Sequence, residues 1–346
     1  MDLKDFIVVG ENIHCTRSVK RGGIKMTELD DGTEAIKFKI DGHARTLAVP
    51  ANWEEVSPNY AKGKCKHVAV AIYQALHGDD NTQQTAKGYL KYLADRQIQK
   101  GARFLDVNVD EYSSDPAKAV EIMDWLTTFL GEHCDTPLSI DSSNVDVLAK
   151  GLENCRDALG APMVNSISLE REASIDVVKQ FDAETIVNAA GIADLPCDVD
   201  GRLKNFREII GKIDTAGIER SRLHLDPLVL PVSTDPMNAK RFLDATEAAA
   251  NEFEGCNFNG GLSNVSFGMP NRKLLNQVFM LLCAERGTNG GIIDPLTMSV
   301  DAVAALDRAS ERCKLAEAGL LGEDMYGMEY LAAHRDGRLK APKTSG

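Results

Sequence analysis

RFLDVNVDEYSSDPAKAVEIMDWLTTFLGEHCDTPLSID, residues 103–141, holds two short apolar runs separated by one long amphipathic stretch. The runs are 103–109 and 137–141, and a helical pattern fills 116–130 between them. Short, mostly apolar runs are typical of parallel strands that are buried on both faces. A strand, a helix and a second strand in this order predict a parallel βαβ unit.

The same alternation continues on both sides of this unit. We expect six further strands, at 6–9, 162–167, 185–188, 223–226, 261–265 and 291–294. Further helical patterns lie at 82–100, 144–159, 175–181, 203–216, 236–253, 272–286 and 300–320. Eight strands alternating with helices favour a closed (β/α)8 TIM barrel over the alternative, an open doubly wound sheet. We expect one barrel domain over residues 1–346.

An insertion of about residues 20–66 separates the first strand from its helix. Within it, 34–40 and 44–49 alternate in polarity on either side of Asp41-Gly42, which predicts a β-hairpin. A loop after the first barrel strand belongs to the active-site face, so the insertion is expected to be a lid, a partner-docking element or a decoration without function. The tail, from about 336 to 346, is expected to be frayed.

Composition and charge narrow the class of protein. The net charge of −13 argues against a nucleic acid or an anionic membrane as partner. The chain shows neither a secretory signal pattern nor a long apolar run, and none of its eight cysteines forms a CxxC pair. We therefore expect a cytoplasmic protein with reduced thiols and no metal site. The histidines His14, His67, His77 and His224 are expected to be structural or on the surface.

Polar residues recur at the carboxyl ends of the expected strands, which converge on one mouth in a barrel. They are Asp106, Asn108, Asp141, Asn165, Asn188, Asp226, Asn264 and Asp294. Buried carboxylates and amides need partners, and a ligand rich in N–H donors, such as the 2-amino-4-oxo edge of a pterin, would supply them. Each Asp alone could instead cap a helix, and the cluster could hold Mg²⁺. No GxGxxG, Walker A or GxSxG motif is present.

These segments resemble the pterin-binding methyltransferases. This group includes the methyltetrahydrofolate:corrinoid protein methyltransferases, the folate domain of cobalamin-dependent methionine synthase and, more distantly, dihydropteroate synthase. The resemblance runs through residues 9–12, 105–108, 139–144, 164–166 and 225–228. The most specific piece is Gly-Leu-Ser-Asn-Val-Ser-Phe-Gly-Met-Pro at 261–270, which is similar to the methyltransferase branch.

The resemblance implies roles for individual residues. Asp141, Asn165 and Asp226 match the positions that hydrogen-bond the pterin ring, and Asn264 matches the Asn that reaches toward N5. Asn264 and Asp141 are therefore the expected catalytic residues. Asn108, Glu11 and Asn188 are expected to line the substrate site. One departure is Glu11-Asn12-Ile13-His14, where the family commonly has Glu-Arg-Ile-Asn.

The resemblance also implies a function. The expected enzyme moves a methyl group between N5 of tetrahydrofolate and the cobalt of a corrinoid on a partner protein, in either direction. The corrinoid is expected on another chain because no Asp-x-His-x-x-Gly motif is present here. A homodimer is expected from the family. Two alternatives remain: a dihydropteroate synthase, and a folate or corrinoid-protein binding module without catalysis.

Overall fold

The computed structural model describes residues 3–340. Its main sheet has eight strands in the order β12-β11-β10-β9-β8-β7-β1-β13. The strands are β1 (Ile7–His14), β7 (Ala102–Asn108), β8 (Leu138–Asp141), β9 (Met163–Ile167), β10 (Glu184–Asn188), β11 (Leu223–Asp226), β12 (Asn257–Phe258) and β13 (Gly290–Ile293). The chain after β12 pairs with β13 through a parallel bridge between Gly261 and Ile292. The fold is a (β/α)8 barrel, which confirms the prediction.

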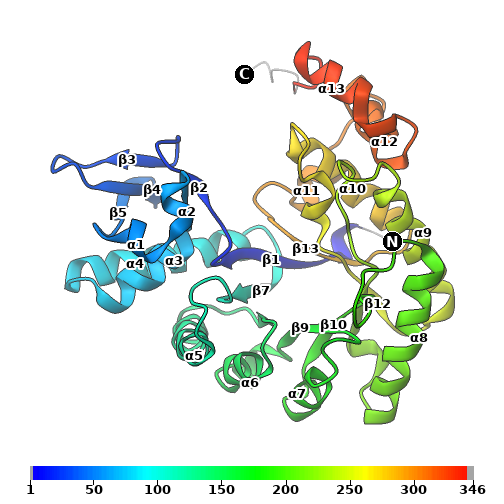
Figure 1. Cartoon of the computed structure of the whole chain (residues 1–346), viewed down its shortest axis with the longest axis horizontal. Helices are drawn as coiled ribbons and strands as arrows, with labels where there is room; N and C mark the ends of the chain where they lie inside the picture. The colour runs from blue at the N-terminus through cyan, green and yellow to red at the C-terminus, as the bar shows by residue number, and fades with distance from the viewer. Residues whose placement is uncertain (1–2, 341–346) are drawn as a thin grey trace. The chain divides into compact units, whose positions relative to one another are not determined.

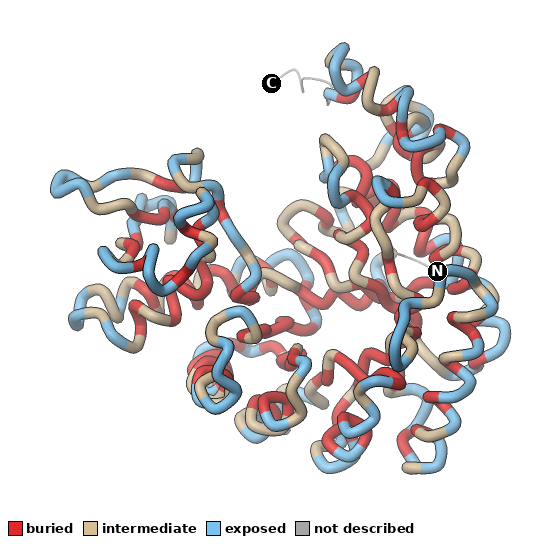
Figure 2. Tube along the Cα trace, viewed as in Figure 1, coloured by how far each residue is buried: buried red, intermediate tan, exposed pale blue. Residues whose placement is uncertain are grey.

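Helices alternate with these strands. They are α4 (Asp80–Ile98), α5 (Pro116–His133), α6 (Val145–Glu153), α7 (Ser174–Gln180), α8 (Val199–Ala216), α9 (Asn238–Glu252), α10 (Arg272–Glu285), α11 (Val300–Ala304), α12 (Glu311–Leu321) and α13 (Met328–Arg335). The strand interiors are buried, whereas the helices carry both buried and exposed positions (Figure 2). Leu105, Val107 and Ile140 are fully buried. This pattern explains why the strands are apolar runs and the helices are amphipathic.

The chain divides into two compact units. One, the β9–β13 unit, consists of residues 1–9, 100–103 and 164–346; the other, the β7–β8 unit, consists of 10–99 and 104–163. The β9–β13 unit carries α7 to α13. The β7–β8 unit carries the second half of β1, the insertion and the helices up to α6.

The predicted hairpin is confirmed within the β7–β8 unit. β4 (Glu34–Ile40) pairs antiparallel with β5 (His43–Ala48), and Asp41 and Gly42 turn between them with φ of 50° and 78°. A third strand, β3 (Met26–Glu28), extends this small sheet. The sheet lies beside α4 (Figure 1), and the ring of Phe38 packs edge-on against that of Tyr89 at 4.8 Å between centroids.

The insertion also holds short elements that the sequence did not reveal. β2 (Val19–Lys20) pairs antiparallel with β6 (Lys64–Cys65), which brings the two ends of the insertion together. Two short helices, α1 (Trp53–Val56) and α2 (Pro58–Ala61), follow the hairpin. The helix α3 (His67–His77) then leads to α4.

Two predicted elements are wrong. The seventh strand is β12, at Asn257–Phe258, and the stretch predicted as that strand is instead a 3₁₀ helix, η4 (Leu262–Ser266). The helix predicted at 300–320 is interrupted, because α11 ends at Ala304 and α12 begins at Glu311. Periodicity does not distinguish a 3₁₀ helix from a buried strand in a short apolar run. It also does not detect a turn within a long amphipathic run.

Of the tail expected to be frayed, residues 341–346 lie outside the described residues. Leu339, just before them, is 2% exposed, and its carbonyl oxygen accepts a hydrogen bond from the side chain of Asn271.

Over residues 3–340, no helix has both the length and the apolar character needed to cross a membrane.

Candidate functional site

A buried imidazole–carboxylate pair lies at the carboxyl end of β1. His14, the last residue of that strand, is 9% exposed, and its Nε2 lies 2.8 Å from Oδ2 of Asp106 on β7. Asp106 is fully buried, and its other oxygen accepts a 2.5 Å hydrogen bond from the hydroxyl of Ser139 on β8. Three neighbouring strands therefore each contribute one member of this chain of hydrogen bonds.

Asp141 stands beside this pair at the end of β8. In the parallel register of β7 and β8, Asn108 is the partner of Asp141, and its side-chain amide donates a 2.9 Å hydrogen bond to the Asp141 carboxylate. Asp141 does not cap the next helix, because Asn144 accepts from the first backbone N–H groups of α6. The helix-cap alternative for Asp141 is therefore wrong, and its carboxylate keeps capacity for a ligand.

The loops after β7 and β8 are tied together next to Asp141. The carboxylate of Asp110 accepts hydrogen bonds from the hydroxyls of Ser142 and Ser143 and from the backbone N–H of Ser143. These bonds hold the residues that directly follow Asp141, and so restrict the direction of its side chain.

The charges of this group shift its proton affinities. Burial and the neighbouring charge of Asp106 raise the pKa of Asp141 to about 7. Burial alone would lower the pKa of His14, but the hydrogen bond and charge of Asp106, together with Asp141 and Glu11, raise it above its ordinary value. Strongly shifted groups of this kind concentrate at functional sites.

Glu11 lies on β1 in the same unit and pairs with Arg17 at 2.5 Å. The side chains of His14, Asp106 and Asp141 bring three potential ligand atoms within 4.8 Å of one another, a spacing that a metal ion also accepts. The hydrogen bond between His14 and Asp106 already pairs two of these atoms. The sequence suggested no partner for His14, and the fold supplies Asp106.

The β9–β13 unit holds the other predicted site residues. Asn188 on β10 is the register partner of Asp226 on β11, and its amide donates a 2.8 Å hydrogen bond to the Ser166 hydroxyl. Asn165 lies one residue before Ser166 on β9. Asn188 and Asp226 are the last residues of their strands, whereas Asn165 lies in the middle of the adjacent strand β9.

Asp226 is a buried carboxylate that is not a helix cap. Its Oδ1 accepts a hydrogen bond from the backbone N–H of Leu228 at 2.8 Å, and the backbone of Gly261 also favours its ionised form. Burial raises the pKa of Asp226 to about 6, although these backbone groups and the charge of Arg202 oppose the rise. Arg202, on α8, is fully buried, and none of its three guanidinium nitrogens has a hydrogen-bond partner among residues 3–340.

Asn264 lies in η4 and not at the end of a strand. Its backbone N–H donates a hydrogen bond to the carbonyl of Gly261, and its side-chain nitrogen lies 2.9 Å from where a β-carbon of that glycine would stand. Arg272 holds the same segment: it donates to the hydroxyl of Ser266 and the carbonyl of Ser263, and it lies 4.4 Å from the centroid of the Phe267 ring. A dihydropteroate synthase needs basic side chains for a pyrophosphate, whereas this arginine is engaged with its own loop.

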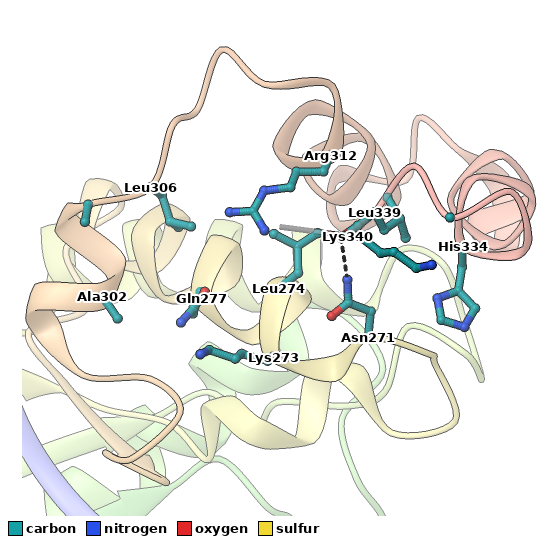
Figure 3. Close-up of a pocket in the computed structure, with 12 residues that line it drawn as sticks. Asn271, Lys273, Leu274, Gln277, Ala302, Leu306, Arg312, His334, Leu339 and Lys340 are labelled. Carbon is teal, nitrogen blue, oxygen red and sulfur yellow. Dashed lines mark hydrogen bonds between the residues drawn. The ribbon is translucent and has the colours of Figure 1, made fainter. Parts of the chain in front are cut away.

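Two cavities lie away from the residues that the sequence predicted for the site. One, of about 520 Å³ in the β9–β13 unit, is lined by Lys273, Arg312 and Lys340 among others, and no carboxylate lines it (Figure 3). The other, of about 590 Å³ in the β7–β8 unit, lies against α1, α3 and the loop after β7. No predicted site residue lines either cavity. The candidate site is therefore identified by the polar residues at the strand ends and not by the volume of a cavity.

Sequence reasoning missed three residues of these groups. His14 occupies the last position of the first strand, the same place that drew attention to the other strand ends, so the signal was available. Ser139 and Arg202 carry no such signal. Ser139 precedes the strand end by two residues, and Arg202 lies on a helix.

Comparison with known proteins identifies the family of this chain. Residues 80–294 match the family described as pterin binding enzyme. The methylcorrinoid:tetrahydrofolate methyltransferase of Eubacterium limosum is 26% identical over 262 residues, which cover 74% of this chain and 91% of that protein.

Several solved structures that are similar to this chain are dihydropteroate synthases. The Xanthomonas albilineans enzyme with 4-aminobenzoic acid has a TM-score of 0.51 and 22% identity, covering 67% of this chain and 89% of that chain. The same enzyme with indole-2-carboxylic acid and 6-chloroguanine has a TM-score of 0.52 and 21% identity, covering 67% and 88%. At these identities the likeness shows the fold alone. The match over more than half of its length places the chain in the pterin-binding enzyme family.

Proposed function

We propose that this protein is a methyltransferase that moves a methyl group between N5 of tetrahydrofolate and the cobalt of a corrinoid carried by a partner protein. The similarity to the Eubacterium limosum enzyme, whose name specifies these two substrates, supports the proposal. The Gly-Leu-Ser-Asn-x-Ser-Phe-Gly-x-Pro segment at 261–270 supports the same branch of the family.

The observation that carries the proposal is the connection of Asp226 and Asn264 through Gly261. The backbone of Gly261 helps to hold down the pKa of the Asp226 carboxyl, and the side-chain nitrogen of Asn264 lies 2.9 Å from where a β-carbon of the same glycine would stand. A carboxylate suits the N3–H and 2-amino donors of a pterin, and an amide suits N5 on the other ring. One glycine thus adjoins both the group proposed to bind the pterin and the group proposed to act at its reacting atom.

The proposed roles follow from this chemistry. Asp226 and Asn165 bind the pterin ring, with Asn188 and Glu11 in the lining. Asn264 donates a hydrogen bond to N5, which strengthens as charge develops there in the transition state. Asp141, oriented by Asn108, is the proposed group for proton exchange with the bound folate. The low-valent cobalt of the corrinoid supplies the nucleophile for demethylation, so no nucleophilic side chain is required.

The test is an anaerobic incubation of the protein with methyltetrahydrofolate and free cob(I)alamin, followed by visible spectroscopy. Formation of methylcobalamin is the expected result. Its absence, together with loss of folate binding in calorimetry, would overturn the proposal. Folate binding without transfer to free cobalamin or to a corrinoid protein would instead favour a binding module.

Two variants sharpen the test. Asn264→Ala should lower turnover by about 10²-fold with folate affinity largely retained, because its hydrogen bond forms chiefly in the transition state. Asp226→Asn should weaken folate binding instead. A parallel assay with a dihydropterin pyrophosphate and p-aminobenzoate tests the rival synthase, and product in that assay would assign the chain to it.

A further inference from the structure

His14 differs from the other polar strand ends in three respects. It is titratable near neutral pH, it stands where the family it resembles commonly has Asn, and it is bonded to a carboxylate that is fully buried. Asp106, the partner, is 92 residues away in sequence. Burying a carboxylate costs free energy, which the hydrogen bonds to its partners must offset.

The hydrogen bonds distinguish a buried end from a more exposed end in the cluster of His14, Asp106 and Asp141. Asp106 is the inner member and is fully engaged, since Ser139 donates to one oxygen and His14 contacts the other. Asp141 is the outer member, half-buried, with one hydrogen bond from Asn108. His14 is therefore held from the inside, and a second carboxylate lies within 4.8 Å of it on the more exposed side.

We propose that His14, held by Asp106, stores the proton that the folate releases on methylation and regains on demethylation, and exchanges it through Asp141. The inference rests on the proposed function and identifies a residue that acts at the same site. His14 does not touch the folate in this scheme, and it is a positioning residue that acts through Asp141.

The proton balance of the reaction provides a task for such a group. When tetrahydrofolate is methylated, the N5 lone pair forms the bond to the methyl carbon, and the cobalt–carbon bond breaks with its electron pair left on cobalt. N5 then loses its hydrogen as a proton, which passes to Asp141 and on to His14. In demethylation the same proton returns to N5, and the electron pair of cobalt forms the new bond to carbon.

The charges that face His14 suit this task. Asp106 from β7, Asp141 from β8 and Glu11 from its own strand all favour the protonated imidazole, and Glu11 is itself paired with Arg17. Asp141 also senses Asp106 and Asp110. These carboxylates raise the pKa of His14, and burial with Asp106 raises that of Asp141 to about 7, so both side chains hold a proton more tightly than they would in water.

The decisive variant is His14→Asn. Asn keeps an amide that can bond to Asp106 but takes up no proton at these pH values. The matched control is His43→Asn, the same change at an exposed position of the hairpin in the same unit. A second variant, Asp106→Asn, keeps the shape of the partner and removes its charge.

Three measurements on the full-length protein test the proposal. In single-turnover transfer between methyltetrahydrofolate and cob(I)alamin, His14→Asn should lower the rate by about 10²-fold and remove an ionisation near neutral pH from the rate profile. Calorimetry of tetrahydrofolate binding in buffers of different ionisation heat should show a changed proton count. NMR titration should give His14 a pKa above about 6.5, falling in Asp106→Asn. His43→Asn should change none of these.

Three outcomes would overturn the inference. The first is a pH profile and a proton count in His14→Asn that equal those of the unaltered protein. The second is an NMR pKa of His14 at or below its ordinary value. The third is a divalent metal ion in the purified protein that is lost in His14→Asn. Failure of the unaltered protein to transfer methyl would instead count against the proposed function, and the NMR titration would still decide the proton affinity of His14.

Discussion

The side-chain nitrogen of Asn264 lies 2.9 Å from the point where a β-carbon on Gly261 would stand. Real contacts to a β-carbon are almost never this short, so any side chain at 261 must displace the amide of Asn264. Only glycine therefore lets Asn264 occupy its observed position. This requirement explains a glycine at the start of the 261–270 segment although its backbone φ of −71° would suit any residue.

Gly261→Ala should consequently lower methyl transfer while the fold is retained. A displacement of about 1 Å in a positioning group can cost about 10²-fold in rate, and we expect a loss between tenfold and that size. The measurement is single-turnover transfer beside folate affinity. Gly211→Ala on α8, where an added methyl meets nothing within 4 Å, is the control and should retain full activity. Equal rates in the two variants would count against a role for Asn264.

Arg202 should keep Asp226 ionised. The pKa of Asp226, raised by burial to about 6, is held from rising further by the charge of Arg202. Because the ionised carboxylate accepts the pterin donors, folate affinity should be present above this pKa and decline as the pH falls through about 6. Arg202→Met should raise the pKa of Asp226 and so move that decline to higher pH. At a fixed pH below the midpoint, affinity should then be weaker by about tenfold for each pH unit that the midpoint moves.

Calorimetric titration of folate binding between about pH 5 and pH 8 checks this expectation. Arg202→Lys retains the charge and should leave the midpoint near that of the unaltered protein, which also guards against a folding defect in the methionine variant. Asp226→Asn should bind weakly without this pH dependence. A midpoint that is unchanged in Arg202→Met would show that the charge of Arg202 does not affect the pKa of Asp226.

The apolar runs of the sequence correctly predicted that Asp141 and Asp226 stand at the ends of strands, because these runs have ordinary length. The same reasoning misplaced Asn264, because β12 has only two residues and the apolar run after it is a 3₁₀ helix. Periodicity cannot distinguish such a run from a buried strand. The importance of Asn264 came from the motif, and its correct element came only from the structure.

The partners of the site residues were less accessible than the residues themselves. His14 and Asp106 are 92 positions apart, and Arg202 is a helix residue whose burial depends on the packing of α8. A single sequence carries no information on which strand ends become neighbours beyond the order of the sheet. The polar residues of the site could be predicted from the sequence. The charges and hydrogen bonds that surround them therefore had to be taken from the structure.

Arg272 should act on the reaction by holding the loop that carries Asn264. It bonds to Ser263 and Ser266 on either side of Asn264 and lies over the ring of Phe267. Arg272→Gln should lower turnover more than folate affinity, because the loop loses two charge-assisted hydrogen bonds and the stacked contact. Lys273→Gln removes the same charge one residue later, from an exposed side chain, and should leave turnover unchanged. Similar losses in both variants would indicate a general effect of charge.

Ser139 should stabilise the fold through Asp106. Both are fully buried, and the Ser139 hydroxyl donates a 2.5 Å hydrogen bond to a carboxylate that no solvent reaches. Ser139→Ala removes that donor, and such a loss costs about 1–3 kcal/mol in the free energy of unfolding, with more expected for a charged acceptor. Ser143→Ala, which removes an exposed hydrogen bond to Asp110, should cost less than about 1 kcal/mol. Urea denaturation of the two variants gives the comparison. Equal free energies of unfolding in the two variants would mean that the remaining contacts satisfy Asp106. The bond from Ser139 would then contribute little to holding Asp106 in place beside His14.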